Sequence, residues 1–269
     1  MITTLSILGT QVMPFDNVGA GFQMAARSTA GNAYNPTQAG DCNNVASPLN
    51  NETIPWSPSD LNLPSANGIL FDVTPRNYDG GSTTACLTSQ VPLPYTFTFG
   101  ATLGDGIQIA KQGMIVDMSI TRQAGSQPLE LNISELPSIY PLASIFPYAY
   151  WSANGVTFNA LNYNGSNDIH SWPYTQNMYV TGQAVMLCSS GNAICIALYS
   201  NSTTQMLISH RQGVHYELGL MTLIAAQSGT ISDYNTHTAR KILAVGTPAT
   251  VSAVIAGAKA TITNWGDIH

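Results

Sequence analysis

The chain has 269 residues and a formal net charge of −6 at pH 7, from 14 acidic and 8 basic side chains. No stretch gathers lysine and arginine into a basic track, which argues against nucleic acid as a partner. No apolar run reaches the roughly 18 to 20 residues that a membrane span needs, so we expect no membrane insertion. Charged residues make up only 8% of the chain, and a surface of neutral hydrogen-bonding groups is typical of exported proteins.

The first residues, "MITTLSILGTQVM" at 1–13, lack the basic region and cleavage site of a signal peptide, and we read them as a first strand. Turn signals then recur along the chain, and short segments with β-branched or aromatic alternation lie between them at 68–75, 95–103, 113–121, 178–188, 193–200, 205–210 and 217–227. This pattern predicts an all-β fold: a large antiparallel β-sandwich, of supersandwich or jelly-roll type, with residues 1–269 as a single domain. Residues 41–66, rich in Asn, Pro and Ser, are expected to form a long covering loop.

A short C-terminal helix is predicted over about 248–260. Thr247 can cap it and Pro248 suits its first turn. Apolar residues follow at helical spacing, namely Val251, Val254, Ile255 and Ala258.

The four cysteines are even in number and form no CxxC pair, which favours two disulfides over a zinc site. In "CSSGNAIC" a tight hairpin would bring Cys188 and Cys195 to bonding distance. Cys42 and Cys86 are the remaining pair. Four buried free thiols are the alternative.

The first candidate site is the loop "AYNPTQAGDC" at 33–42. Pro36 fixes its own backbone and restricts the residue before it, so the polar side chains of Asn35, Thr37 and Gln38 are held with little ordering cost. Asn35, Gln38 and Asp41 are the candidate substrate-binding residues of this loop. Such a loop suits sugar hydroxyls. The alternative is a turn whose side chains only satisfy backbone amides.

The second candidate site is "SELPSIYP", where Glu135 lies close in sequence to the aromatic segment "IFPYAYW" with Tyr150 and Trp151. Rings against the apolar face of a pyranose, beside a carboxylate, are what a glycosidase cleft or lectin groove needs. A core aromatic cluster with Glu135 at its rim is the alternative.

The third is "NDIHSWPY", in which Asp168, His170, Trp172 and Tyr174 alternate. In an extended chain all four would project from one face, as an acid/base pair on a sugar platform. An edge loop with exposed rings and no chemistry is equally consistent with the pattern.

The fourth is "SHRQGVHYELG", with Arg211 and His215 as candidate substrate-binding residues. His210 and His215 face opposite sides of a continuous strand, so we expect no metal. The sequence also lacks a GxSxG elbow, a phosphate-binding GxxxxGK[ST], an HExxH motif and a dinucleotide-binding GxGxxG, and we expect no cofactor.

Four separated pieces carry a family resemblance: "YNPTQAGD" at 34–41, "TPRNYD" at 74–79, "SELPSIYP" at 134–141 and "AVGTPATVSAVI" at 244–255. With them the chain resembles large secreted bacterial β-sandwich proteins of the carbohydrate-active type. The resemblance implies a concave sheet face whose rim is formed by the Asn-Pro-Thr-Gln loop and the Glu-Leu-Pro segment. It marks Glu135, Asn35 and Gln38 as candidates.

The leading functional hypothesis is a secreted or extracellular, or periplasmic, enzyme acting on a poly- or oligosaccharide. A glycoside hydrolase, with Glu135, Asp168 and His170 as candidate catalytic residues, is favoured over a polysaccharide lyase. The alternatives are a non-catalytic carbohydrate-binding module, for which rings and amides suffice, and a structural extracellular β-protein subunit. A homo-oligomer is left open.

Overall fold

The structure is a computed structural model that describes the backbone of residues 5–7, 10–13, 22–28, 33–34, 54–56, 68–73, 77–78, 95–103, 112–122, 131–142, 144–173, 177–211, 215–223 and 236–266. Side chains are described mainly in 112–118, 139–142, 144–173, 178–203, 205–208 and 240–266.

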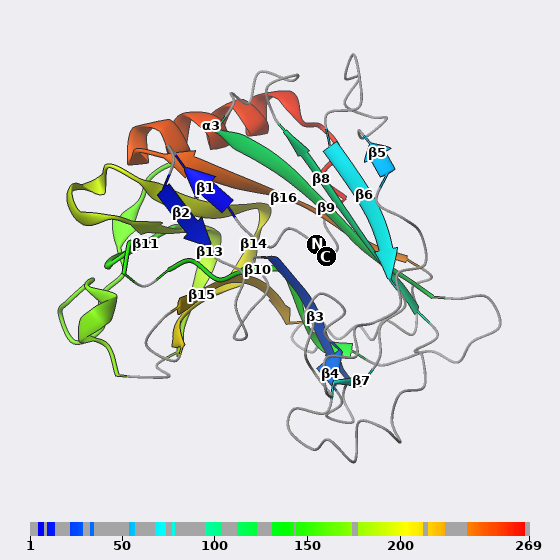
Figure 1. The fold of residues 1–269 in the computed structure, drawn as a ribbon, viewed down its shortest axis with the longest axis horizontal. Helices are drawn as coiled ribbons and strands as arrows, with labels where there is room; N and C mark the ends of the chain where they lie inside the picture. Colours follow the sequence, from blue (N-terminus) through cyan, green and yellow to red (C-terminus); the bar gives the residue numbers. More distant parts are fainter. Residues whose placement is uncertain are drawn as a thin grey trace.

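One sheet contains 14 of the described strands, and their pairings are antiparallel (Figure 1). Its first arm consists, in hydrogen-bonded order, of β5 (Ile54–Trp56), β6 (Gly68–Val73), β8 (Tyr95–Leu103), β9 (Gly113–Arg122) and β16 (Thr236–Gly246). The path then crosses β14 (Cys195–Arg211) into a second arm of β15 (His215–Leu223), β10 (Leu131–Ile139), β3 (Phe22–Ser28), β4 (Ala33–Tyr34) and β7 (Asn77–Tyr78).

Strand β14 is the element that both arms share. Along one edge, its residues 195–200 pair with β16 and its residues 205–211 pair with β15. Along its other edge it pairs with β13 (Asn177–Cys188), followed outward by β11 (Tyr148–Ser152) and β12 (Asn159–Ala160). The sheet therefore divides at residues 201–204 of β14, a polar stretch that separates the two apolar halves of the strand.

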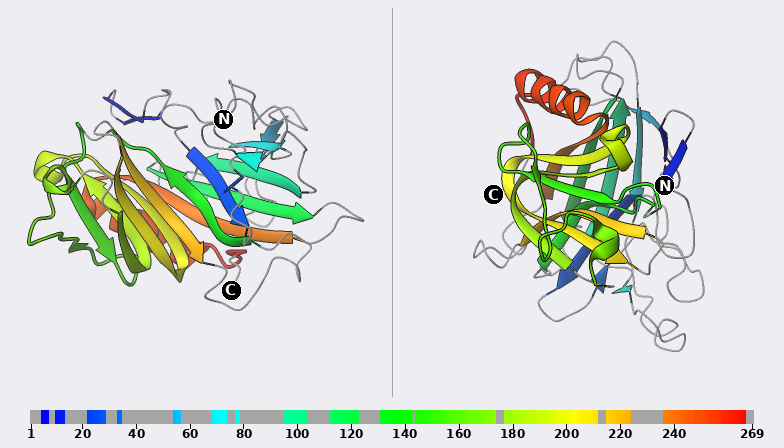
Figure 2. Two further views of the ribbon diagram at one scale, coloured as in Figure 1. Left: turned by 90° about the horizontal axis from the view of Figure 1, so that it is seen from below. Right: turned by 90° about the vertical axis from the view of Figure 1, so that its left-hand side faces the viewer.

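The predicted C-terminal helix is confirmed as α3 (Pro248–Thr261). Thr247 caps it by accepting a hydrogen bond from the Thr250 backbone N–H at 3.2 Å. Figures 1 and 2 show α3 lying along one face of the first arm, with the β15–β10–β3 arm on the side away from the helix. We call the covered side of β13, β14 and β16 the helix face and the opposite side the far face.

The helix face holds one hydrophobic core cluster of the described residues. Register places Ser152, Ala184, Tyr199, Ile242 and Ile115 in one row across five strands, and all five are fully buried. The apolar stripe predicted for the helix packs on these rows, with its members Val251, Val254, Ile255 and Ala258 at most 2% exposed. Burial of this stripe, rather than helix propensity, stabilises so short a helix.

The segment after α3 is held on the same face by Arg240, which also forms an ion pair with Asp117. Arg240 Nε and Nη2 donate to the two carboxylate oxygens of Asp117 at 2.6 and 3.0 Å, and Nη1 donates to the Asn264 carbonyl at 2.7 Å. The Trp265 ring lies edge-on to Tyr199, with centroids 5.6 Å apart. The bidentate geometry gives the pair direction as well as energy, so the chain end is positioned over the core.

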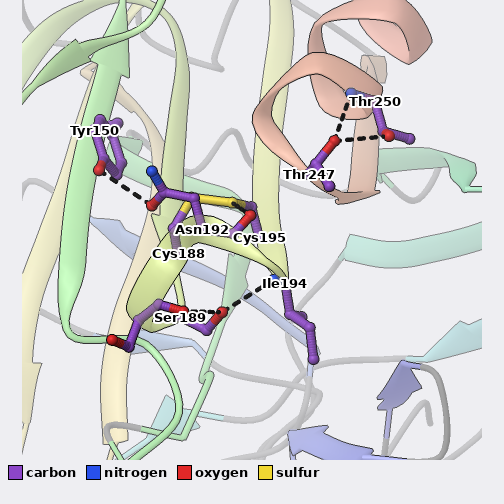
Figure 3. Close-up of a disulfide and its surroundings, with 9 residues drawn as sticks. Tyr150, Cys188, Ser189, Asn192, Ile194, Cys195, Thr247 and Thr250 are labelled. Atoms are coloured by element: carbon purple, nitrogen blue, oxygen red, sulfur yellow. Dashed lines mark hydrogen bonds between the residues drawn. A yellow bond between two sulfur atoms is a disulfide. The ribbon is translucent and has the colours of Figure 1, made fainter.

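The predicted Cys188–Cys195 disulfide is confirmed, with Cα atoms 4.1 Å apart (Figure 3). It joins paired residues of β13 and β14 across the short turn η4 (Ser190–Asn192). Within this turn, Ser189 Oγ accepts from the Ile194 N–H at 2.9 Å and Asn192 Oδ1 accepts from the Tyr150 hydroxyl at 3.2 Å. A disulfide fits an oxidising compartment, as expected for an exported protein. Cys42 and Cys86 lie outside the described residues.

The all-β, sandwich-like fold class is confirmed, and three local expectations need comment. The predicted first strand is two strands, β1 (Leu5–Ile7) and β2 (Thr10–Met13), paired with each other. The segments 193–200 and 205–210 are one continuous strand, β14. Of the expected covering loop at 41–66, only Ile54–Trp56 is described, as strand β5. The single domain stays a prediction.

Candidate functional site

The segment 161–173 follows the outer edge of β11 and is held there by backbone hydrogen bonds. The Leu161 N–H donates to the Ala149 carbonyl at 2.9 Å, and the Ala149 N–H donates to the Asn167 carbonyl at 3.1 Å. Further along, the Ile169 N–H donates to the Pro147 carbonyl at 2.7 Å. The segment is thus hydrogen-bonded to the β11 region at its start, through Leu161, and again at residues 167–169. These two attachments fix the backbone of the residues around Asp168.

Asp168 and His170 meet at the end of this segment. Asp168 caps the short 3-10 helix η3 (Ile169–Ser171), and its Oδ1 accepts from the His170 backbone N–H at 3.0 Å. The same Oδ1 lies 3.3 Å from His170 Nδ1. Both side chains are about half exposed, at 43% for Asp168 and 48% for His170. The structure therefore brings these two predicted residues together as a carboxylate–imidazole pair at the protein surface.

Trp172 does not share the exposed face expected for it. It is only 3% exposed, its Nε1 donates to the Ser166 carbonyl at 3.1 Å, and its ring packs 6.1 Å from that of Tyr163. Trp172 would share a face with Asp168 and His170 only if this segment were extended. Because η3 turns the backbone at about three residues per turn, Trp172 rotates inward behind the Asp168–His170 pair. Tyr174 lies outside the described residues.

Tyr150 and Trp151, predicted to line one aromatic surface, are adjacent in β11 and therefore face opposite sides of the sheet. Tyr150 pairs with Met186 and packs against the core of the helix face. Trp151 pairs with Val185 on the far face. The aromatic residue whose backbone lies opposite Asp168 is instead Tyr148, which forms an isolated bridge with Asp168 and is half-buried.

Three other candidates are placed by their backbones. Glu135 lies in β10 opposite Met221, just before a register shift. Arg211 and His215 are direct partners at the hairpin of β14 and β15, so the structure brings this pair together. The remaining candidates, Asn35, Gln38 and Asp41, lie outside the described residues. Among the residues described, no group of three His, Cys, Asp or Glu side chains could hold a metal ion.

A polar group on the far face was not predicted from the sequence. Lys241 is 4% exposed and its Nζ donates to Oγ of its cross-strand partner Ser200 at 2.7 Å. Ser200 Oγ is 3.3 Å from Ser202 Oγ. At the adjoining register shift of β13, Gln183 Nε2 donates to the Asn201 carbonyl at 2.6 Å, and its Oε1 is buried without a partner. The available signal was a lysine next to the apolar run "ILAV".

No helix in the described ranges is long and apolar enough to cross a bilayer. Comparison with known proteins found no matching family model and no matching curated protein.

Solved structures that match this chain include the Slr1438 protein from Synechocystis sp. PCC 6803, at 12% identity and a TM-score of 0.40, over 91% of this chain and 74% of that one. A galactose mutarotase related enzyme from Lactobacillus acidophilus matches at 10% identity and a TM-score of 0.44, over 89% and 84% of the two chains. The α-galactosidase AgaB from Geobacillus stearothermophilus matches at 9% identity and a TM-score of 0.43, over 91% of this chain but only 31% of the enzyme. Structural matches this weak give no information on activity. The family resemblance described from the sequence, and the function that it implies, therefore stay predictions.

Proposed function

We propose that the protein binds carbohydrate through the edge surface, defined as Tyr148, Tyr163, Asp168 and His170. The observation that carries the proposal is the half-exposed Asp168–His170 pair, 3.3 Å apart on a segment anchored to β11. A carboxylate accepts hydrogen bonds from two neighbouring sugar hydroxyls, and an imidazole adds a donor or acceptor beside it. Half-buried tyrosine rings offer the apolar contact that the C–H face of a pyranose requires.

Preorganisation supports a binding role for this surface. The Asp168 backbone N–H donates to Ser166 Oγ at 3.1 Å, and the Ser171 hydroxyl donates to the Asp168 carbonyl at 2.6 Å. Trp172, buried behind the pair, fixes the turn from inside. A ligand therefore meets side chains whose backbone is already ordered, and the entropic cost of binding falls accordingly.

Glycoside hydrolysis is the finer form of this proposal, with Glu135 as the second carboxylate. Hydrolysis needs two carboxyl groups within roughly 5 to 10 Å of each other. In the hydrogen-bonded order, β10 is followed by β15, β14, β13 and β11, so four spacings of about 4.8 Å separate the strand of Glu135 from the strand beside Asp168. Only a close approach of β10 to the outer edge of β11 could pair these acids. Binding without cleavage is therefore our first proposal.

The test is calorimetric titration with a panel of neutral and acidic oligosaccharides. Asp168→Asn preserves the shape of the cap but removes the charge, and we expect it to weaken binding about tenfold or more. His170→Gln should weaken binding less. Thr261→Ala, exposed at the end of α3, is the matched control and should leave the affinity unchanged. Absence of binding to every sugar, or unchanged affinity in Asp168→Asn, would refute the edge surface.

A parallel assay of reducing ends separates hydrolysis from binding. If the protein releases reducing ends from a polysaccharide, and Glu135→Gln abolishes release while the affinity persists, the hydrolase form is supported. Binding with no release of reducing ends or unsaturated products supports the binding module.

A further inference from the structure

The edge surface contains a tight turn built on an Asn-Gly dipeptide. The Tyr163 N–H donates to the Ser166 carbonyl at 2.9 Å and the Ser166 N–H donates back to the Tyr163 carbonyl at 3.1 Å. The two residues between them, Asn164 and Gly165, have positive φ angles of 50° and 85°. These angles define a two-residue hairpin turn of the type that Asn-Gly favours.

Both turn residues are open to solvent. Asn164 and Gly165 are exposed, and a Cβ placed on Gly165 would meet nothing within 4 Å. In the described part of the chain, no group binds the Asn164 side-chain amide. The carbonyl carbon of this amide and the backbone nitrogen of Gly165 are therefore unobstructed by neighbouring side chains.

We propose that Asn164 is a site of spontaneous deamidation and isoaspartate formation, with water as the only co-reactant. The Gly165 backbone nitrogen, losing its proton, attacks Asn164 Cγ. A nitrogen–carbon bond forms, the bond from Cγ to the amide nitrogen breaks, and ammonia leaves. Water then opens the resulting succinimide at one of its two carbonyls, giving aspartate or an isoaspartate that carries one extra backbone atom.

The chain supplies its own control in a second Asn-Gly dipeptide. Asn154 is also exposed, but its Oδ1 accepts from the backbone N–H groups of Val156 and Thr157 at 3.0 and 2.9 Å. Oδ1 also accepts from the Ser152 hydroxyl at 3.0 Å. These bonds hold the side-chain carbonyl in place, so ring closure would first have to break them.

The glycine of the second dipeptide is equally constrained. Gly155 is buried at a φ of 83°, and a Cβ placed on it would lie 2.5 Å from the Tyr199 ring. No room is left for the backbone to rotate toward the Asn154 side chain. The same dipeptide thus occurs in an open and a locked environment within one protein.

Deamidation at Asn164 would act on the edge surface. Ser166 accepts two of the bonds that order this surface, from the Trp172 indole through its carbonyl and from the Asp168 N–H through its hydroxyl. An extra backbone atom in the turn displaces Ser166, and the new carboxylate adds negative charge near Asp168. The loss of the turn is independent of ligand, whereas its effect on affinity rests on the proposed function.

The experiment measures, over time, the mass of the peptide that contains Asn154 and of the peptide that contains Asn164. Asn164, Gly165 and Ser166 form an N-glycosylation sequon, so the protein is taken from a host that adds no N-linked glycans. It is incubated at mildly alkaline pH, then digested with chymotrypsin. Because Phe158 separates the two dipeptides, they can be recovered in different peptides. Replacement of an amide by a carboxyl group raises the peptide mass, and isoaspartyl and aspartyl forms separate by chromatography.

We expect Asn164 to deamidate about tenfold or more faster than Asn154 in the folded protein, since several hydrogen bonds must break at Asn154. In denatured protein the two rates should converge. Asn164→Gln should abolish the fast phase and leave the Asn154 rate unchanged. Equal rates in the folded protein, or a faster rate at Asn154, would overturn the proposal. This readout needs no sugar, so its outcome is distinct from that of the binding test.

Discussion

The helix face and the far face of the central strands β13, β14 and β16 bury different sets of side chains. On the helix face, cross-strand rows of apolar residues meet α3, and the polar pair Arg240–Asp117 lies at their margin. On the far face, apolar rows such as Val185, Leu198 and Leu243 are interrupted by a buried lysine and serine. Both faces bury a cation, but on the helix face Arg240 is paired with the Asp117 carboxylate, whereas on the far face Lys241 donates to a serine hydroxyl. Four substitutions test this contrast.

The largest effect is expected on the helix face at Trp265. Trp265→Ala removes a nearly buried ring from its edge-on contact with Tyr199, and we expect it to lower the free energy of unfolding by about 3 kcal/mol. Urea unfolding followed by circular dichroism measures the loss. Trp265→Phe keeps the ring contact and loses only the indole bond to the Ile262 carbonyl, so it should cost much less. Equal losses would show that the contact with Tyr199 contributes little.

The ion pair at the margin of the helix face should follow closely. Arg240→Met leaves the Asp117 carboxylate without its bidentate partner, which we expect to cost about 3 kcal/mol. The double variant Arg240→Met/Asp117→Leu removes both charges and should recover most of that loss. Calorimetric unfolding of Arg240→Met, Asp117→Leu and the double variant gives the coupling energy. A double variant as unstable as the single one would mean that the bond to Asn264, rather than the charge, dominates.

On the far face, Ser200→Ala should cost about 2 kcal/mol, because it takes a buried acceptor from the Lys241 ammonium. The same unfolding measurement applies. Ser202→Ala is the comparison, since Ser202 is less buried than Ser200 and its Oγ lies 3.3 Å from Ser200 Oγ. If Ser200→Ala proved neutral, the polar group would contribute nothing to stability and the contrast between the faces would weaken.

The smallest effect is expected at the start of α3. Thr247→Ala removes the hydroxyl that caps the helix and should cost about 1 kcal/mol. Thr247→Ser retains the acceptor and should restore most of this. A loss as large as that of Trp265→Ala would place more of the stability of the helix face in the cap than in its packing.

Much of the fold could be predicted from local patterns. The strands β8 and β13 and the helix α3 lie within one or two residues of their predicted bounds, because alternation and capping are properties of short segments. Strand β16 was missed, since Arg240 and Lys241 stand in the middle of it, and each donates to a partner distant in sequence: the Asp117 carboxylate for Arg240 and the Ser200 hydroxyl for Lys241. Such partners are visible only in the folded chain.

The candidate site was predictable only in part, because some of its contacts are local in sequence and others are not. The motif "NDIHSWPY" pointed to Asp168 and His170, and their proximity depends on only three residues of backbone. The inward turn of Trp172 depends on its contacts with Ser166 and Tyr163, and both of these residues lie outside the motif. Whether Glu135 approaches this surface depends on how the strands β10 and β11 of one large sheet are placed in space, and local sequence carries no information on that.

The pairing of β9 with β16 has a consequence for synthesis on the ribosome. Asp117 and Arg240 are 123 residues apart in sequence, so the first arm cannot attach to β14 until β16 has left the ribosome. Contacts of such long range slow folding and leave apolar strand edges exposed in the meantime. The nascent chain should therefore depend on chaperones, and its acquisition of protease resistance should coincide with the emergence of β16.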